Sequence, residues 1–410
     1  MGSTQRLVIV GNGMAAGRLL DELKAYPHSP YQITLIGDEA ADGYNRILLS
    51  PLLAGEEDLD SIRLKQGEWY QQQGIEVIKG EKVIGGDRQA RTLQTDTGRC
   101  LGYDRLILAT GSAPIMLGLP GEELEGVMAF RTIKDVQRMQ AVAKPGARAV
   151  VIGGGLLGIE AAYGLLRQGM SVTLVNKAPW LLNRQLDQVA GGYLAQHLQQ
   201  RGLALRLDAG TEAFIGEQGK VTGVLLEDGE LLDATLVVIA IGVKPLTELG
   251  QQLGLECGRG ILVNDQLQTS DPHIFALGEC CQWRQQVFGL VAPIWDQARV
   301  LAASLHGETA SYAYQDSATK LKVSGIDLVS AGPIEQGCDY SLTFEDRELG
   351  FYRCLNLSQG KIQSLVLYGD VEDGNWYLDL LQQQADVTAL GEQLIFGRAY
   401  CGSALTGEQQ

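Results

Sequence analysis

The chain has 410 residues, enough for two or three domains of ordinary size. It carries 33 basic and 49 acidic residues, and its net charge of −16 argues against binding to nucleic acids or anionic membranes. No apolar run approaches the roughly 18 residues that a transmembrane helix needs. The N-terminus also shows no basic segment or cleavage site of a secretory signal. We therefore expect a soluble protein of the cytoplasm.

The seven cysteines predict neither a disulfide framework nor a metal site. Their number is odd, their spacing is irregular and no Cys-x-x-Cys pair occurs. The only close pair is Cys280–Cys281, and adjacent cysteines rarely form a bridge. With only four histidines, far apart in the sequence, we expect no bound metal.

The first predicted element is a buried parallel strand at residues 6–10, because the run is almost entirely apolar. Residues 11–16 then read Gly-Asn-Gly-Met-Ala-Ala and lead into a helical pattern. In such a turn, backbone N–H groups and the helix N-terminus bind the diphosphate of a dinucleotide. A second strand at 32–36 precedes Asp38 and Glu39, and Asp38 stands about where a ribose-binding carboxylate belongs. The predicted contacts are Gly11, Gly13, Met14, Ala15, Ala16, Asp38 and Glu39.

The same pattern recurs in the middle of the chain. A strand at 148–152, a Gly-rich turn, a helix at 159–168 and a strand at 172–175 follow one another. One such turn is weak evidence, but two in the same strand–turn–helix–strand order are far more specific. The predicted contacts in this second turn are Gly153, Gly155, Leu156, Leu157 and Gly158.

At the ribose position of the second unit stand Asn176 and Lys177 instead of a carboxylate. Asn176 is able to bond a ribose hydroxyl. Lys177 is either a partner for a 2′-phosphate or an ordinary solvated lysine. The sequence leaves the choice between NADH and NADPH open.

Segments that we assign to the first domain follow the second strand–turn–helix–strand unit in the sequence. A hairpin-rich stretch at 76–106 leads to a strand that ends in Ala109-Thr110-Gly111, and a strand at 237–241 ends at Gly242. Residues 269–279 then continue the first domain. We predict a discontinuous first domain (5–115 and 243–318), an inserted second domain (116–242) and a C-terminal domain (319–410).

The C-terminal domain is predicted to combine strands with one helix. The strands are expected at 320–323, 327–330, 353–357 and 362–368, with a hairpin turn at 358–360. The helix is expected at 375–384, with Leu378, Leu381 and Trp376 facing inward.

These motifs, in this order, resemble the two-dinucleotide-binding pyridine-nucleotide:flavin oxidoreductases. The resemblance implies an α/β fold of two Rossmann-like domains, with the FAD domain interrupted by the NAD(P)H domain, and a C-terminal α+β interface domain. It places FAD on the first turn, NADH or NADPH on the second, and an acid, here Glu279, on the FAD ribitol. The further FAD contacts that it implies are Arg46, Val83, Ala109, Thr110, Gly111, Gly278, Pro293 and Trp295. For NAD(P)H it adds Asn176, Lys177 and Gly242.

Four segments narrow the likeness: Tyr44–Pro51, Asn183–Asp187, Gly289–Ala298 and Thr319–Gly325. They look like the flavoprotein portion of assimilatory nitrite reductase large subunits and like stand-alone electron-transfer subunits of assimilatory nitrate reductases. The resemblance implies that NAD(P)H reduces FAD and that the electrons pass to a separate redox protein. That partner is expected to be a nitrate or nitrite reductase catalytic subunit, since the chain lacks iron–sulfur cysteine clusters of its own.

No residue is assigned a certain catalytic role. Pro51 stands where relatives that serve ferredoxins carry a lysine that pairs with a glutamate matching Glu160. Glu160 is therefore either beside the nicotinamide or a residue that caps a helix turn. Arg46 is placed either to reach the flavin or to form a surface salt bridge. A helix at 296–305, opened by Pro293 and Trp295, would direct its positive end at the flavin, although Trp295 also suits a core position.

Two thiol chemistries of the wider superfamily are not expected. Between Ala16 and Cys100 there is no cysteine, so neither a disulfide reductase nor an NADH oxidase or peroxidase with a redox cysteine fits. Two alternatives stay open: a rubredoxin or ferredoxin reductase, whose partner is an iron–sulfur carrier, and a non-catalytic flavin-binding regulatory or assembly protein. The sequence does not predict the oligomeric state.

Overall fold

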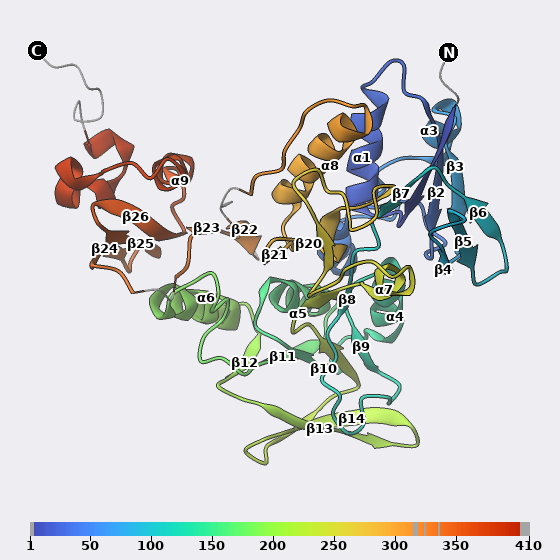
Figure 1. Ribbon diagram of the computed structural model, residues 1–410. Coiled ribbons are helices and arrows are strands. Elements are labelled where there is room, and N and C mark those ends of the chain that lie inside the picture. Colours follow the sequence, from blue (N-terminus) through green and yellow to red (C-terminus); the bar gives the residue numbers. More distant parts are fainter. Residues whose placement is uncertain (1–3, 315–318, 324, 335–336, 402–410) are drawn as a thin grey trace, which may run out of the picture. The chain divides into compact units, whose positions relative to one another are not determined.

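The computed structural model describes residues 4–314, 319–323, 325–334 and 337–401 (Figure 1). The chain forms two compact units, and both are discontinuous in sequence. The first comprises Met1–Leu52, Glu56–Ile115 and Val243–Tyr314; the second comprises Leu53–Gly55, Met116–Gly242 and Gln315–Gln410. The division into three domains stays a prediction, and its boundary at residue 318 lies outside the described residues.

A five-stranded parallel sheet forms the centre of the first unit. Its strands, in spatial order, are β19 (Ile274–Ala276), β7 (Arg105–Leu108), β1 (Gln5–Val10), β2 (Tyr31–Gly37) and β3 (Glu76–Lys79). The predicted strands at 6–10 and 32–36 are confirmed as β1 and β2. Residues 7–10 of β1 are all buried, as expected of a strand covered on both faces.

Helices α1 (Met14–Lys24) and α8 (Val291–Leu305) pack against each other although they are far apart in sequence (Figure 1). Helix α8 begins at Val291, five residues before the predicted start at Asp296. The prediction placed Pro293 before the helix. A proline is tolerated in the first turn of a helix, however, because the N–H that it lacks would have no intrahelical partner there.

Smaller elements complete the first unit. The antiparallel strands are β4 (Val83–Asp87), β5 (Thr92–Thr95) and β6 (Cys100–Gly102), and β8 (Ser112–Pro114) with β17 (Val243–Pro245). A third small sheet contains β18 (Ile261–Val263), β20 (Cys281–Trp283) and β21 (Gln286–Val287). The short helices are η1 (Arg46–Leu48), α3 (Gly67–Gln72), α7 (Glu248–Gln252) and η2 (Gly278–Cys280). Helix α2 (Leu49–Ala54) begins in the first unit, and its last two residues are assigned to the second.

Glu81 holds the β4–β5–β6 sheet at the point where the chain leaves β3. Its buried carboxylate accepts hydrogen bonds from Thr95 Oγ1 and Thr97 Oγ1, both at 2.6 Å, and from Arg99 Nε at 3.0 Å. These hydrogen bonds, with the charge of Arg99, lower the pKa of Glu81 from its ordinary value of 4.5 to about 2.

Because Glu81 titrates at a lower pH in the folded chain than in the unfolded chain, it stabilises the fold above about pH 4.5. That contribution is lost as the pH falls toward about 2. We expect Glu81→Gln to lower the melting temperature at neutral pH and to flatten its decline between about pH 5 and about pH 3. Calorimetric melting temperatures at neutral pH, about pH 5 and about pH 3 test this prediction. A variant of the exposed Glu217, Glu217→Gln, is the control. An equally steep decline in Glu81→Gln would contradict the assignment.

The second unit contains another five-stranded parallel sheet. Its order is β12 (Ala204–Leu207), β11 (Ser171–Asn176), β10 (Arg148–Ile152), β16 (Leu236–Ile239) and β9 (Val127–Ala129). Strands β13 (Thr211–Glu217), β14 (Lys220–Leu226) and β15 (Leu231–Asp233) form an antiparallel sheet in the same unit (Figure 1). Within residues 116–242 the helices are α4 (Ile133–Val142), α5 (Leu156–Arg167) and α6 (Gln188–Gln200). Helix α5 begins three residues before the predicted start at Ile159.

The C-terminal residues of the second unit form an antiparallel sheet with one α-helix. The strand order is β22 (Thr319–Val323), β23 (Ile326–Ala331), β26 (Lys361–Tyr368), β25 (Phe351–Ser358) and β24 (Tyr340–Asp346). The four predicted strands and the hairpin turn are confirmed, and β24 was not predicted. Ser324, within the resemblance segment Thr319–Gly325, lies outside the described residues. Short 3₁₀ helices η3 (Thr388–Phe396) and η4 (Arg398–Tyr400) follow α9 (Gly374–Gln382).

The inward face of α9 differs from the prediction. Tyr377, Leu380 and Leu381 are buried, whereas Leu378 and Trp376 are only partly buried. The three buried positions share one side of a helix because they are spaced three and four residues apart. The prediction is therefore confirmed for Leu381 and wrong for Leu378 and Trp376, which lie one position away from the buried Tyr377.

Asp187, in the resemblance segment Asn183–Asp187, accepts two hydrogen bonds within the second unit. Its Oδ1 accepts the backbone N–H of Ala190 at 2.9 Å and so caps α6, and its Oδ2 accepts the Tyr352 hydroxyl at 2.8 Å. The segment therefore joins α6 to β25 of the same unit. No role in nucleotide binding is needed to explain it.

Two further observations concern the part of the chain that the structure describes. No helix there is long and apolar enough to cross a membrane. No cluster of three His, Cys, Asp or Glu side chains is arranged to hold a metal ion among the same residues. The absence of a metal in the functional protein stays a prediction.

Candidate functional site

The first glycine turn joins β1 to α1. Gly11 has a φ of +112°, a conformation that favours glycine, and a Cβ at this position would collide with the carbonyl oxygen of Ala109. The Ala109 N–H donates to the Val10 carbonyl at 2.8 Å. The turn therefore lies directly against the Ala109-Thr110-Gly111 segment at the end of β7, as both motifs require.

Gly13 leaves the N-terminus of α1 accessible. It is the N-cap residue, it receives no side-chain cap from the described residues, and no described atom lies within 4 Å of the place where its Cβ would stand. Helix N-termini with exposed N–H groups bind diphosphates. The turn thus fits the FAD diphosphate, with the fully buried Ala16 packed below it and Met14 and Ala15 in the first helical turn.

Two acidic residues follow β2, and the structure distinguishes between them. Asp38 is exposed, whereas Glu39 accepts hydrogen bonds from the Tyr44 hydroxyl at 2.8 Å and from Arg46 Nη2 at 2.5 Å. Burial opposes the charge of Arg46, yet the nearby Tyr44, Glu39 and Glu279 raise the pKa of its guanidinium. Of the two predicted uses of Arg46, the structure contains the salt bridge, with Glu39. A contact with the flavin stays a prediction.

Glu279 is held in place by a hydrogen bond within the first unit. The Ser112 hydroxyl donates to Glu279 Oε2 at 2.8 Å, and Gly278 before it has a φ of +83°. Thr110 and Gly111 contact the returning chain, since Thr110 Oγ1 donates to the Leu246 carbonyl at 3.1 Å. These contacts bring three predicted motifs together in the first unit.

Gln297 is a site residue that the sequence did not reveal. Its side chain is fully buried on α8, and its Oε1 accepts the N–H of Gly278 at 2.8 Å. It fixes the Gly278–Glu279 segment against the helix predicted to face the flavin. The sequence feature that could have revealed Gln297 is its position as a polar residue within the apolar helix face formed by Ile294, Ala298 and Leu301.

Three further predicted contacts lie in or beside the apolar core of the first unit. Pro293 and Val83 are buried. Trp295 is partly buried against the core, with the Arg18 guanidinium 5.7 Å from its ring centre. Contact of these three residues with FAD stays a prediction.

The second glycine turn repeats the geometry of the first. Gly153 has a φ of +116°, and a Cβ there would collide with the Ala240 carbonyl oxygen. A Cβ at Gly11 would collide with the Ala109 carbonyl oxygen in the same way. Gly155 is the N-cap of α5, with no described atom within 4 Å of its Cβ position. Gly158 packs against the Gly153 carbonyl too closely for any side chain. This turn therefore fits a second dinucleotide, beside Leu156, Leu157 and Gly242.

The side chain of Asn176 is already hydrogen-bonded to other residues of the chain. Its Oδ1 accepts the Gly154 N–H at 2.9 Å, and its Nδ2 donates to the carbonyls of Ala178 and Trp180, both at 3.0 Å. Only 9% of the residue is exposed. The geometry does not favour the predicted bond to a ribose hydroxyl, which stays a prediction.

Lys177 and Glu160 occupy different surroundings in this unit. Lys177 is 84% exposed, and its Nζ lies 3.7 Å from Glu227 Oε1. Glu160 is partly buried in the second turn of α5, whose N-cap is Gly155. Both predicted uses of Glu160 stay open.

The cysteines near Glu279 are not arranged for thiol chemistry. Cys280 and Cys281 are buried, and burial raises the pKa of both thiols. A redox thiol must form a thiolate readily and be accessible. These residues therefore belong to the packing of the first unit.

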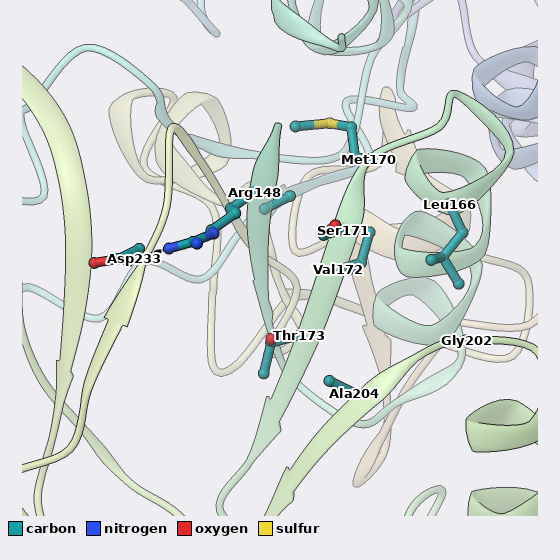
Figure 2. A pocket seen from close by; sticks show the side chains of 10 residues that line it. Arg148, Leu166, Met170, Ser171, Val172, Thr173, Gly202, Ala204 and Asp233 are labelled. Carbon is teal, nitrogen blue, oxygen red and sulfur yellow. Dashed lines mark hydrogen bonds and ion pairs between the residues drawn. The ribbon is translucent and has the colours of Figure 1, made fainter. Parts of the chain in front are cut away.

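A cavity of about 330 Å³ in the second unit lies at the amino ends of β10, β11 and β12. It is lined by Arg148, Ala149, Leu166, Met170, Ser171, Val172, Thr173, Gly202, Ala204 and Asp233. Figure 2 shows Arg148 and Asp233 pointing toward each other, and the two form an ion pair. Dinucleotides bind beyond the carboxyl ends of parallel strands, so this cavity is separate from the second turn.

Comparison with known proteins agrees with this geometry. Residues 5–300 match the pyridine nucleotide-disulphide oxidoreductase family, and residues 318–385 match the rubredoxin NAD+ reductase C-terminal domain. Nitrite reductase [NAD(P)H] of Bacillus subtilis is 43% identical over 95% of this chain and 48% of its own length. The assimilatory nitrate reductase electron transfer subunit of the same organism is 41% identical over 95% of this chain and 51% of its own length.

A solved structure extends the likeness to three dimensions. A chain of the covalent putidaredoxin reductase–putidaredoxin complex is 27% identical and superposes with a TM-score of 0.86, over 96% of this chain and 99% of that chain. This chain spans about half the length of the two Bacillus relatives. The matches confirm the predicted α/β class and the predicted resemblance to pyridine-nucleotide oxidoreductases. The chain belongs to the pyridine nucleotide-disulphide oxidoreductase family.

Proposed function

We propose that this protein passes electrons from NAD(P)H through FAD to a separate redox protein of nitrate or nitrite assimilation. The observation that carries the proposal is the pair of glycine turns with the same geometry at Gly13 and Gly155, one in each unit. Identity of 41–43% over 95% of the chain to two Bacillus subtilis proteins of nitrogen assimilation supports the choice of partner.

The chain's own residues would bind and orient the two nucleotides. The N-terminus of α1 would hold the FAD diphosphate, Asp38 or Glu39 the adenosine ribose and Glu279 the ribitol, with Gln297 keeping Glu279 in place. The N-terminus of α5 would hold the diphosphate of NAD(P)H. Bound FAD supplies the redox chemistry, because it accepts two electrons at once and releases them singly. Side chains are then needed for orientation and electrostatics, with no nucleophile.

A rubredoxin or ferredoxin reductase is the second candidate. It is favoured by the match of residues 318–385 to the rubredoxin NAD+ reductase C-terminal domain. It is also favoured by the likeness to putidaredoxin reductase, which was solved bound to putidaredoxin. Both candidates share the NAD(P)H half-reaction and differ only in the acceptor.

We also propose a cytoplasmic location. All seven cysteines are free thiols, as is usual for proteins of a reducing compartment.

Two measurements test these proposals. Anaerobic NADH or NADPH should bleach the flavin absorbance of the purified holoprotein. The reduced protein should then support nitrate or nitrite reduction when the catalytic protein encoded beside it is added. Reduction of small iron–sulfur carriers alone would favour the second candidate. A flavin that neither nucleotide bleaches would contradict electron transfer and favour a regulatory or assembly protein.

A further inference from the structure

The end of β11 is where a dinucleotide-binding βαβ unit meets the adenosine ribose. In this chain the residue there, Asn176, has its amide hydrogens and one lone pair engaged by Gly154, Ala178 and Trp180. The side chain is held inside the turn. A carboxylate that accepts hydrogen bonds from the ribose hydroxyls must therefore come from a neighbouring segment.

Residues 208–210 run beside this end of β11. The Ala209 N–H donates to the Asn176 carbonyl at 3.0 Å, and the Asp208 N–H donates to the Ala178 carbonyl at 3.2 Å. Gly210 follows, just before β13. A Cβ on Gly210 would collide with the carboxylate of Glu227.

Glu227 comes from the turn between β14 and β15. Its backbone N–H donates to the Gly210 carbonyl at 2.9 Å, and its carboxylate lies over the Gly210 α-carbon. Only a glycine at 210 allows this placement. A carboxylate distant in sequence is thereby brought to the edge of β11, where Rossmann units commonly place an acid at the strand end itself.

Lys177 lies at this edge of the sheet, and Glu227 faces it. Lys177 Nζ lies 3.7 Å from Glu227 Oε1, with 84% and 56% of the two side chains exposed. The pair is accessible to a ligand. Because Lys177 is already paired, its attraction for a further anion is partly offset.

We propose that Glu227 is the specificity-determining carboxylate of the second nucleotide site and that it makes the protein prefer NADH. Its oxygens accept hydrogen bonds from the free ribose hydroxyls of NADH. They repel the 2′-phosphate of NADPH, which carries about two negative charges at neutral pH. This inference rests on the proposed binding of NAD(P)H at the Gly153–Gly158 turn.

Binding of two nucleotide fragments to the FAD-loaded protein tests the inference without turnover. Calorimetric titration compares ADP-ribose with 2′-phospho-ADP-ribose in the wild type, Glu227→Gln, Glu227→Gln with Lys177→Met, and Glu230→Gln. The last variant is a matched control, because Glu230 lies on the same turn but pairs with Arg206 at 2.8 Å.

The wild type should bind ADP-ribose at least about tenfold more tightly than its 2′-phosphate, the effect of one partly exposed charge at a few ångströms. Glu227→Gln should narrow this preference by about tenfold, since it removes the repulsion and releases Lys177. Adding Lys177→Met should reverse the part of that change that comes from the released lysine. Glu230→Gln should keep the wild-type ratio.

Several results would overturn the inference. These are a wild type that binds the 2′-phosphate as tightly as ADP-ribose, an unchanged ratio in Glu227→Gln, or an equal shift in Glu230→Gln. A double variant as permissive as Glu227→Gln would refute the pairing with Lys177. Failure of both fragments to bind would refute the second nucleotide site itself, and with it the proposed function.

Discussion

The Gly13→Val variant is expected to fold and to be purified without FAD. Gly13 has φ −99° and ψ −169°, an extended conformation that valine adopts readily, and no described atom lies within 4 Å of its Cβ position. The valine methyl groups would instead occupy the approach of the diphosphate to α1. Loss of two charge-assisted hydrogen bonds, about 1.5–3 kcal/mol each, should weaken FAD binding at least about 100-fold.

The ratio of flavin to protein absorbance after gel filtration measures this effect, and circular dichroism reports folding. Gly67→Val is a suitable control, because Gly67 also begins a helix and has open space at its Cβ position. The control should keep its FAD. A Gly13→Val protein with stoichiometric FAD would show that the diphosphate does not bind at this turn.

The Gly155→Val variant should show the complementary defect. Gly155 is the N-cap of α5, with φ −79°, ψ 177° and no described atom within 4 Å of its Cβ position. The variant should therefore fold and retain FAD, while NAD(P)H loses its place at the helix N-terminus. By the same hydrogen-bond estimate, the affinity for NADH should fall at least about 100-fold.

Anaerobic stopped-flow measurement of flavin bleaching tests this prediction. Dithionite, which needs no nucleotide site, should still reduce the flavin of Gly155→Val at the wild-type rate. Slow bleaching by dithionite as well would indicate damage to the flavin site. Bleaching by NADH at the wild-type rate would place the nucleotide elsewhere.

The two glycine turns could be predicted from sequence because their requirements are local. Gly11 and Gly153 need a positive φ, and each follows an apolar strand and precedes an amphipathic helix. Those features are adjacent in the sequence, from Gln5 to Lys24 in the first unit and from Arg148 to Arg167 in the second. The same locality explains why the predicted strands at 6–10 and 148–152 match β1 and β10 closely.

Helix starts and helix faces were predicted less well. Helix α8 begins before Pro293, and α9 buries Tyr377 and Leu380 where Trp376 and Leu378 were predicted. In both cases several positions satisfied the local pattern. The choice among them depends on the element against which each helix packs, which is α1 for α8 and β26 for α9.

By itself, the sequence determined the fold class, the order of the elements and the two turns that fit dinucleotides, because glycine conformation and strand–helix periodicity are properties of adjacent residues. Only the tertiary structure decided that Gln297 supports Gly278, that Asn176 is used inside the chain and that Glu227 faces Lys177. The residues of these contacts lie on separate strands, helices and turns. Their partners are set by how those elements pack, which no local pattern specifies.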